Sequence, residues 1–189
     1  LKNYRTQEQQ RSLGILGVNL IYSAMNYTGD RDRFVLSLLD GLNRKIVEID
    51  FIDLSGPAFP GVDFLANSVE LVHEGLSSAV FFNSDGTVSP PAEAFYKKPV
   101  VVERGKYGVV HDFHSSILSS SSALLKKELD CSGDPLSCFE LTTDSLNGSG
   151  QLDVSELQKR ISSLNSCGYP VLLTRFGAHF NVTRFLRRY

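Results

Sequence analysis

Long apolar runs are missing from this sequence. No stretch of about 18 consecutive apolar residues occurs, so a transmembrane helix is not expected. Charge of one sign is also scarce, because 19 basic residues oppose 21 acidic ones and leave a formal net charge of −2. Bulk electrostatics therefore gives no reason to expect nucleic acid or an anionic membrane as a partner. The chain begins at Leu1 and lacks the apolar core of a signal peptide. From the sequence at its two ends, we expect the chain to be a piece of a longer protein.

Cysteine is sparse as well, with three residues whose spacing matches no zinc site. The expected state is three reduced thiols in a reducing compartment, the cytoplasm or an organelle interior. Cys131 and Cys138 flank a short loop, which leaves a loop disulfide as the alternative. No metal site is expected from these residues. Hydrophobic residues at 42% and charged residues at 21% are ordinary for a globular protein and exclude a disordered or fibrous chain.

Strand and helix patterns alternate along the chain, which predicts an α/β fold with residues 1–189 as a single domain. Strand starts lie roughly 20–40 residues apart, a spacing that suits right-handed crossovers and a mostly parallel sheet of about six strands. Short apolar or alternating segments predict strands at 13–22, 45–54, 79–83, 99–104, 139–143 and 170–176. Helix signals predict helices at 30–42, 62–74, 90–96, 111–130, 153–165 and 178–189.

Two architectures share this alternation: a doubly wound open sheet and part of a (β/α) barrel. We favour the open sheet, since about six strands fall short of the eight of a barrel. In both architectures ligands bind at the carboxyl ends of the strands. Ser55 and Gly56 follow the second expected strand, and Arg175 lies at the end of the last one. These three residues are therefore candidates for binding a phosphate-bearing cofactor.

The most specific segment runs from Gly105 to His114, where a strand leads through a glycine-containing loop into a helix. His111 and His114 are three residues apart, so they share one face of the first helical turn. A helix N-terminus attracts anions, and Lys106 lies in the preceding loop. One interpretation of the pattern is a phosphate held by Gly105 and Lys106, with its charge stabilised by two imidazoles. The alternative is that both histidines are polar residues at a helix start.

This segment resembles the G-x-F-x-P-x-H-x-G-H signature of the nucleotidyltransferases that adenylylate nicotinamide mononucleotide. Gly105 stands at the first glycine, Tyr107 at the aromatic residue, and His111 and His114 at the two histidines. In that superfamily the histidines stabilise charge on the triphosphate during adenylyl transfer. The resemblance therefore implies catalytic roles for His111 and His114, with ATP and Mg²⁺ as cofactors.

Most of the chain is similar to the central region of a mostly bacterial family described as nicotinate- or nicotinamide-nucleotide adenylyltransferase-like. In that family the loop after the fourth strand usually reads R-G-x-F-R-P-V-T. Here Gly108, Val109 and His111 stand at its Arg, Pro and Thr, and Phe113 replaces the second glycine of the signature above. The matching stretches, in order, are 13–27, 37–42, 47–59, 62–110 and 151–189.

Three arginines, Arg184, Arg187 and Arg188, share one face of the last expected helix and are candidate contacts for an acidic partner or a phosphate. A solvated helix end is the alternative. Two further patterns carry less information. Residues 145–156 resemble a calcium-binding loop that lacks two carboxylates, and Glu48 and Asp50 share a strand face; we interpret them as a turn and a solvated edge.

Our expectation about function depends on the residues of the glycine loop that differ from the family patterns. Packing patterns are retained where site residues are lost, which predicts a non-catalytic structural or accessory subunit of a larger complex, derived from a nucleotidyltransferase-like family. Its partners are then other protein subunits. The alternative is an adenylyltransferase-like enzyme that joins ATP to a nicotinamide or nicotinate mononucleotide, with that small nucleotide as its ligand.

Overall fold

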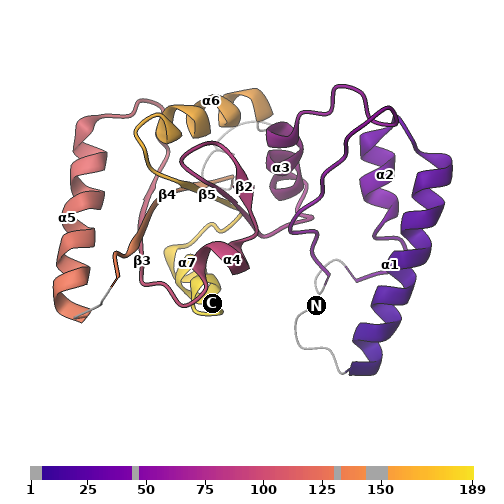
Figure 1. Ribbon diagram of the computed structural model, residues 1–189, viewed down its shortest axis with the longest axis horizontal. Helices are drawn as coiled ribbons and strands as arrows, with labels where there is room; N and C mark the ends of the chain where they lie inside the picture. Colours follow the sequence, from indigo (N-terminus) through magenta and orange to yellow (C-terminus); the bar gives the residue numbers. More distant parts are fainter. Residues whose placement is uncertain (1–5, 44–46, 130–132, 144–152) are drawn as a thin grey trace.

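The structure is a computed structural model that describes residues 6–43, 47–129, 133–143 and 153–189. Its centre is an open sheet of five strands in the order β2-β1-β5-β4-β3 (Figure 1). The pairs β1–β2 and β1–β5 are antiparallel, whereas β5–β4 and β4–β3 are parallel. The strands are β1 (Ala79–Phe82), β2 (Val88–Ser89), β3 (Val100–Gly105), β4 (Leu136–Thr142) and β5 (Val171–Thr174). The expected open α/β sheet is confirmed, but it has five strands instead of six and is mixed instead of mostly parallel.

The first expected strand, 13–22, is wrong, because these residues lie inside helix α1 (Thr6–Asn26). A continuous apolar run does not distinguish a strand from a helix by its period. The buried residues of α1 are Ser12 and Ser23, and the Ser23 hydroxyl bonds that of Ser37 in α2 (Arg31–Ser37). The helix thus packs mainly through small polar residues and Leu16, and leaves most of its large apolar side chains exposed.

The second expected strand, 45–54, is also wrong, since residues 47–54 form no strand. Val47 and Leu54 are buried against Phe34 of α2 and Leu71 of α3 (Phe64–His73). Ile49 and Ile52 pack against the same core, which lies between helices, whereas Phe51 is exposed. Residues 44–46, and most of the calcium-loop-like segment at 145–156, lie outside the described residues.

A hairpin supplies the strand that the sequence pattern missed. The Asn83 N–H donates to the Thr87 carbonyl over 2.7 Å, and Gly86 takes the positive φ of +83° that the turn requires. The expected turn at 84–87 is thus confirmed. The second arm, β2, spans only Val88–Ser89, too short for a period-two pattern to be recognised.

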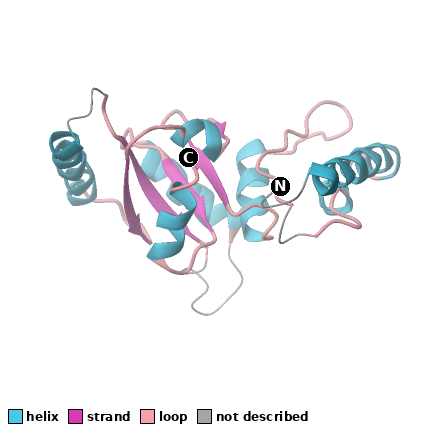
Figure 2. Cartoon of the chain, turned by 90° about the horizontal axis from the view of Figure 1, so that it is seen from below, coloured by secondary structure: helices cyan, strands magenta, loops and turns pink. Residues whose placement is uncertain are grey.

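Helices cover both faces of the sheet (Figure 2). One face packs against α3, α5 (Asp112–Leu129) and α6 (Val154–Asn165), and the other against α4 (Pro91–Phe95) and α7 (His179–Leu186). Figure 1 places α5 at one end of the molecule and the pair α1–α2 at the other. Fully buried side chains of the sheet include Phe81, Phe82, Phe139, Leu141 and Leu172.

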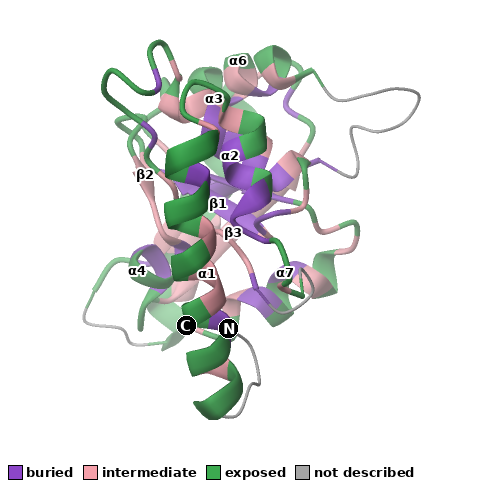
Figure 3. Cartoon of the chain, turned by 90° about the vertical axis from the view of Figure 1, so that its right-hand side faces the viewer, coloured by how far each residue is buried: buried purple, intermediate pink, exposed green. Residues whose placement is uncertain are grey.

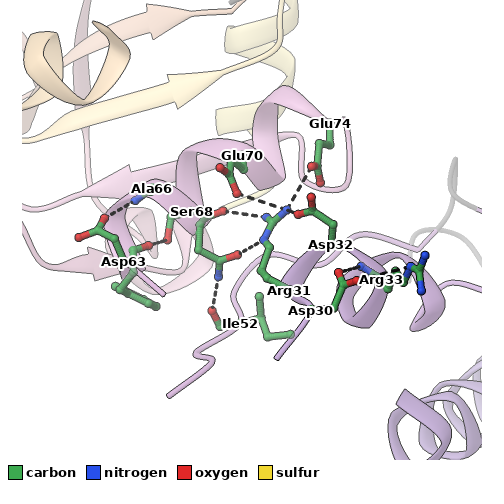
Figure 4. A network of polar contacts seen from close by, with 12 residues as sticks. Asp30, Arg31, Asp32, Arg33, Ile52, Asp63, Ala66, Ser68, Glu70 and Glu74 are labelled. Atoms are coloured by element: carbon green, nitrogen blue, oxygen red, sulfur yellow. Dashed lines mark hydrogen bonds and ion pairs between the residues drawn. The ribbon is translucent and has the colours of Figure 1, made fainter. Parts of the chain in front are cut away.

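Arg31 joins the N-terminal helices to α3 (Figure 4). Its Nε donates to Asn67 Oδ1 over 2.7 Å, and its Nη1 lies 3.3 Å from Glu70 and 3.1 Å from Glu74. Asn67 in turn donates to the Ile52 carbonyl over 3.0 Å. One guanidinium thus holds α2, α3 and the extended segment 47–54 together on the side of α3 that the sheet does not use.

Candidate functional site

The two histidines of the glycine loop bond to each other. The His111 backbone N–H donates to His114 Nδ1 over 3.1 Å, and the two rings stack with centroids 5.9 Å apart. Since α5 begins at Asp112, His111 is its N-cap and His114 its third residue. This contact is one half of a capping box, with histidine in the place of the usual Glu or Gln. His114 Nδ1 is therefore engaged within the protein, where it also lies 3.3 Å from the His111 carbonyl oxygen.

Tyr107 organises the loop before these histidines. It has a positive φ of 46°, and its hydroxyl donates to the Glu103 carbonyl over 2.6 Å. A Cβ atom added to Gly105 would lie 2.8 Å from the Tyr107 ring. Burial, and then the nearby Glu103 carboxylate, raise the pKa of Tyr107 well above its ordinary value. Gly105 thus makes room for a buried aromatic ring, and that ring fills the approach that the resemblance assigns to a phosphate.

Lys106 and Phe113 are both exposed. Lys106 is exposed, and its carbonyl accepts from Arg160 Nη1 of α6 over 2.7 Å. Phe113 is 68% exposed beside His114. The residue that departs most from the nucleotidyltransferase signature is therefore an apolar side chain on the surface of the first turn of α5.

The other candidate phosphate ligands lie elsewhere in the fold. Gly56 lies in a turn before α3 and has a φ of +83°. Its carbonyl accepts from the Phe59 N–H over 3.1 Å. The neighbouring Ser55 is exposed there. Arg175 Nη1 donates to the Gly75 carbonyl at the end of α3 over 3.2 Å. Because residues 47–54 are not a strand, the structure does not bring Ser55 and Gly56 to the carboxyl edge of the sheet.

The C-terminal arginines differ from one another. Arg187 lines a cavity between α7 and the sheet. Arg188 packs with its guanidinium carbon 5.6 Å from the Phe185 ring centroid, and Arg184 is exposed. Of the three residues predicted to meet a partner, only Arg187 therefore belongs to a hollowed site.

A buried ion pair forms the polar centre of that site. Arg104 of β3 stands directly opposite Glu140 of β4, and Arg104 Nε lies 3.1 Å from Glu140 Oε2. The side chains are only 10% and 0% exposed. Thr174 Oγ1 of β5 donates to the other carboxylate oxygen, and Arg104 Nη2 donates to the Phe176 carbonyl. The carboxyl ends of three parallel strands thus meet at one buried carboxylate.

The pair is incompletely satisfied. Among the described residues, neither Arg104 Nη1 nor Glu140 Oε2 has a hydrogen bond of good geometry, although the ion pair itself is close. Burial raises the pKa of Glu140, whereas the Thr174 hydroxyl and then the Arg104 guanidinium act in the opposite direction. A buried polar group without a full set of partners costs stability, so the pair is a candidate for function.

Sequence patterns did not single out this pair, although one signal was present. Glu140 is an acidic residue between two apolar neighbours, Phe139 and Leu141, in an expected strand. A buried acidic residue requires a partner. Which basic residue meets it depends on the register of β3 against β4, and that register is a long-range property.

The cavity beside the pair has a volume of about 450 Å³, within the range of ligand pockets. It lies between β3 and α7. Its wall combines apolar side chains with the ion pair and further basic groups. The lining residues are Lys98, Val100, Val102, Arg104, Glu140, His179, Val182, Thr183, Leu186 and Arg187.

A scan against protein-family models and searches of the curated proteins and of the solved structures found no match to this chain. In the parts of the chain that the structure describes, no group of three or more His, Cys, Asp or Glu side chains is placed to hold a metal ion. Nor is any described helix long and apolar enough to cross a membrane.

Proposed function

We propose that this chain is a non-catalytic α/β accessory subunit of a larger protein complex, derived from a nucleotidyltransferase-like family. The observation that carries the proposal is the burial pattern of α1, in which polar residues are buried and apolar residues are exposed. Its buried residues are serines, whereas most of its large apolar residues are exposed, and Figure 3 shows most of the helix in the colour of exposed residues. Val18, Ile21 and Met25 are 66%, 64% and 78% exposed. Contiguous apolar surface of this kind marks an interaction site.

The partner is a protein. Helices that lie on membrane surfaces carry Lys and Arg on their polar face, but no charged residue occurs between Ser12 and Gly29. Gly14 and Gly17 meet no other atoms within 4 Å of a Cβ placed on them. The outer face of α1 is therefore smooth as well as apolar, which suits close packing against another protein chain.

The glycine loop supports the non-catalytic part of the proposal. His114 uses Nδ1 to cap α5, and Tyr107 occupies the space over Gly105. An enzyme that joins ATP to a mononucleotide would need both histidines to face the triphosphate. In this proposal the chain shares an ancestor with nucleotidyltransferases but not their activity.

The test starts with the native mass of the species that contains the chain in its source extract, measured with intact-chain mass spectrometry on the same fraction. We expect an assembly with other proteins. The double variant Val18→Glu/Ile21→Glu is expected to leave it, because two charges cannot be buried in an apolar contact. A matched control is Ser162→Glu/Ser163→Glu, which adds the same charge to exposed positions of α6.

Both variants should retain the thermal stability of the parent chain, since the substituted residues are exposed. A wild-type chain that migrates alone, or a control that leaves the assembly as readily, would contradict the proposal. Calorimetric titration with ATP and nicotinamide mononucleotide tests the enzyme alternative. Saturable nucleotide binding that is lost in His111→Ala without loss of stability would favour that alternative.

A further inference from the structure

We propose that the cavity between β3 and α7 binds a small organic anion, with a carboxylate or phosphate group on a short apolar body. The residues that line this cavity are far from α1 in the sequence. The inference does not depend on the subunit proposal. The argument starts from the charge of the cavity wall, where Lys98, Arg104 and Arg187 face a single carboxylate, Glu140.

The charge balance leaves basic groups available. Glu140 is already paired with Arg104 at 3.1 Å and accepts from the Thr174 hydroxyl. Lys98 and Arg187 are exposed at the mouth of the cavity and contribute positive charge that no described carboxylate of the wall balances. An anion is therefore the ligand class that this wall attracts.

The buried pair adds a second, independent observation. Arg104 is nine-tenths buried, and its Nη1 has no hydrogen-bond partner among the described residues. A guanidinium donates in a fixed fork, so a donor left over beside a cavity points to an acceptor that the chain itself does not supply. A carboxylate or phosphate oxygen is the acceptor that such a fork binds best.

The remaining lining residues of the cavity are mostly apolar and favour a ligand with an apolar body. Val100 and Val102 project from β3, and Val182 and Leu186 project from α7 towards the same space. Thr183 adds one hydroxyl. Ligand sites commonly combine an apolar wall with a few convergent polar groups. A chain or ring of a few carbons would contact the valines while its anionic end meets the basic groups.

The experiment is an NMR titration of the full chain, with the methyl signals of Val100, Val102, Val182 and Leu186 observed. The probes are pentanoate and butyl phosphate, which separate the two kinds of anion. Pentan-1-ol lacks the charge, and inorganic phosphate lacks the apolar body. Probe concentrations reach ~20 mM, because a ligand of so few atoms binds in the millimolar range.

Matched variants identify the site. Lys98→Gln and Arg187→Gln remove basic groups of the wall, whereas Lys97→Gln and Arg184→Gln remove the same charges outside it. We expect each wall variant to weaken binding of at least one anionic probe about three- to fivefold, the range of a solvent-accessible ion pair. The control variants should bind as the parent chain does.

Three results would overturn the proposal. These are an absence of methyl shifts at the four observed residues, equal affinity for pentan-1-ol and pentanoate, and equal loss of binding in the control variants. If inorganic phosphate were the only probe that binds, the inference that the ligand has an apolar body would be wrong. None of these results depends on whether the chain joins a larger assembly.

Discussion

His114 Nδ1 accepts the backbone N–H of His111 over 3.1 Å, so the two histidines of the glycine loop act on each other. His114→Ala should then lower the free energy of unfolding by about 0.5–1 kcal/mol, the lower range for loss of a helix cap. His114→Gln should lose less, since Gln fills this position in ordinary capping boxes. Urea denaturation of the three proteins checks the ranking. Equal losses in the two variants would contradict the capping role.

Removing Arg104 should be far more costly than removing an ordinary surface arginine. Arg104→Met leaves Glu140 fully buried without its counter-charge, and breaking a buried pair in this way typically costs about 3–5 kcal/mol. The double variant Arg104→Met/Glu140→Leu should recover most of that loss, because neither charge is then buried. Chemical denaturation of both variants measures the difference. A double variant less stable than Arg104→Met would refute this account.

The stability of the chain should depend on pH through Glu140. Burial raises the pKa of this carboxyl, despite the opposing Thr174 hydroxyl and Arg104 guanidinium. Between the ordinary pKa of a glutamate and the raised one, the folded chain keeps a proton that the unfolded chain has released. The contribution of Glu140 to stability is therefore greatest below the ordinary pKa and declines as pH rises through this window.

Glu140→Gln removes that titration, so the difference in unfolding free energy between parent and variant should change across the window and level off above it. Using the difference matters, because hydrogen bonds lower the pKa of Asp85 and Asp153, and these groups lose their stabilising effect as pH falls. Denaturation curves at a series of pH values provide the comparison. A difference that does not vary with pH would show that Glu140 keeps an ordinary pKa.

Gly105→Ala should destabilise the loop through a steric conflict. The new Cβ would lie 2.8 Å from the Tyr107 ring, which is buried and tied to Glu103. Overpacking of this kind typically costs about 1–3 kcal/mol. Gly108→Ala is the matched control, because no atom lies within 4 Å of its added Cβ. Thermal unfolding distinguishes the two, and equal stability of both variants would be evidence against the close approach.

The described cysteines should differ in reactivity towards iodoacetamide. Burial raises the pKa of Cys138 to about 12, whereas Cys167 is exposed. Both are free thiols. Cys131, the other half of the alternative loop disulfide, lies outside the described residues. At pH 8 Cys167 should be modified in the native chain and Cys138 only after unfolding. Peptide mass spectrometry assigns the modified sites, and rapid native labelling of Cys138 would contradict its burial.

Local signals in the sequence determined a large part of this fold. Asp63 and Asp153 each accept a backbone N–H at the start of α3 and α6, and these helices begin within two residues of their predicted starts at 62 and 153. Gly86 marks the hairpin turn. Caps and turns depend on a few neighbouring residues, so a single chain is enough to recognise them.

Tertiary structure alone decided what the apolar segments become and which charges meet. The apolar run at 13–22 lies in a helix that buries Ser12 and Ser23, and residues 47–54 form no strand but pack against α2 and α3. Arg104 and Glu140 meet through strand register although they are 36 positions apart in the sequence. Burial, register and partner choice depend on contacts between distant segments, and the sequence pattern of one segment does not contain them.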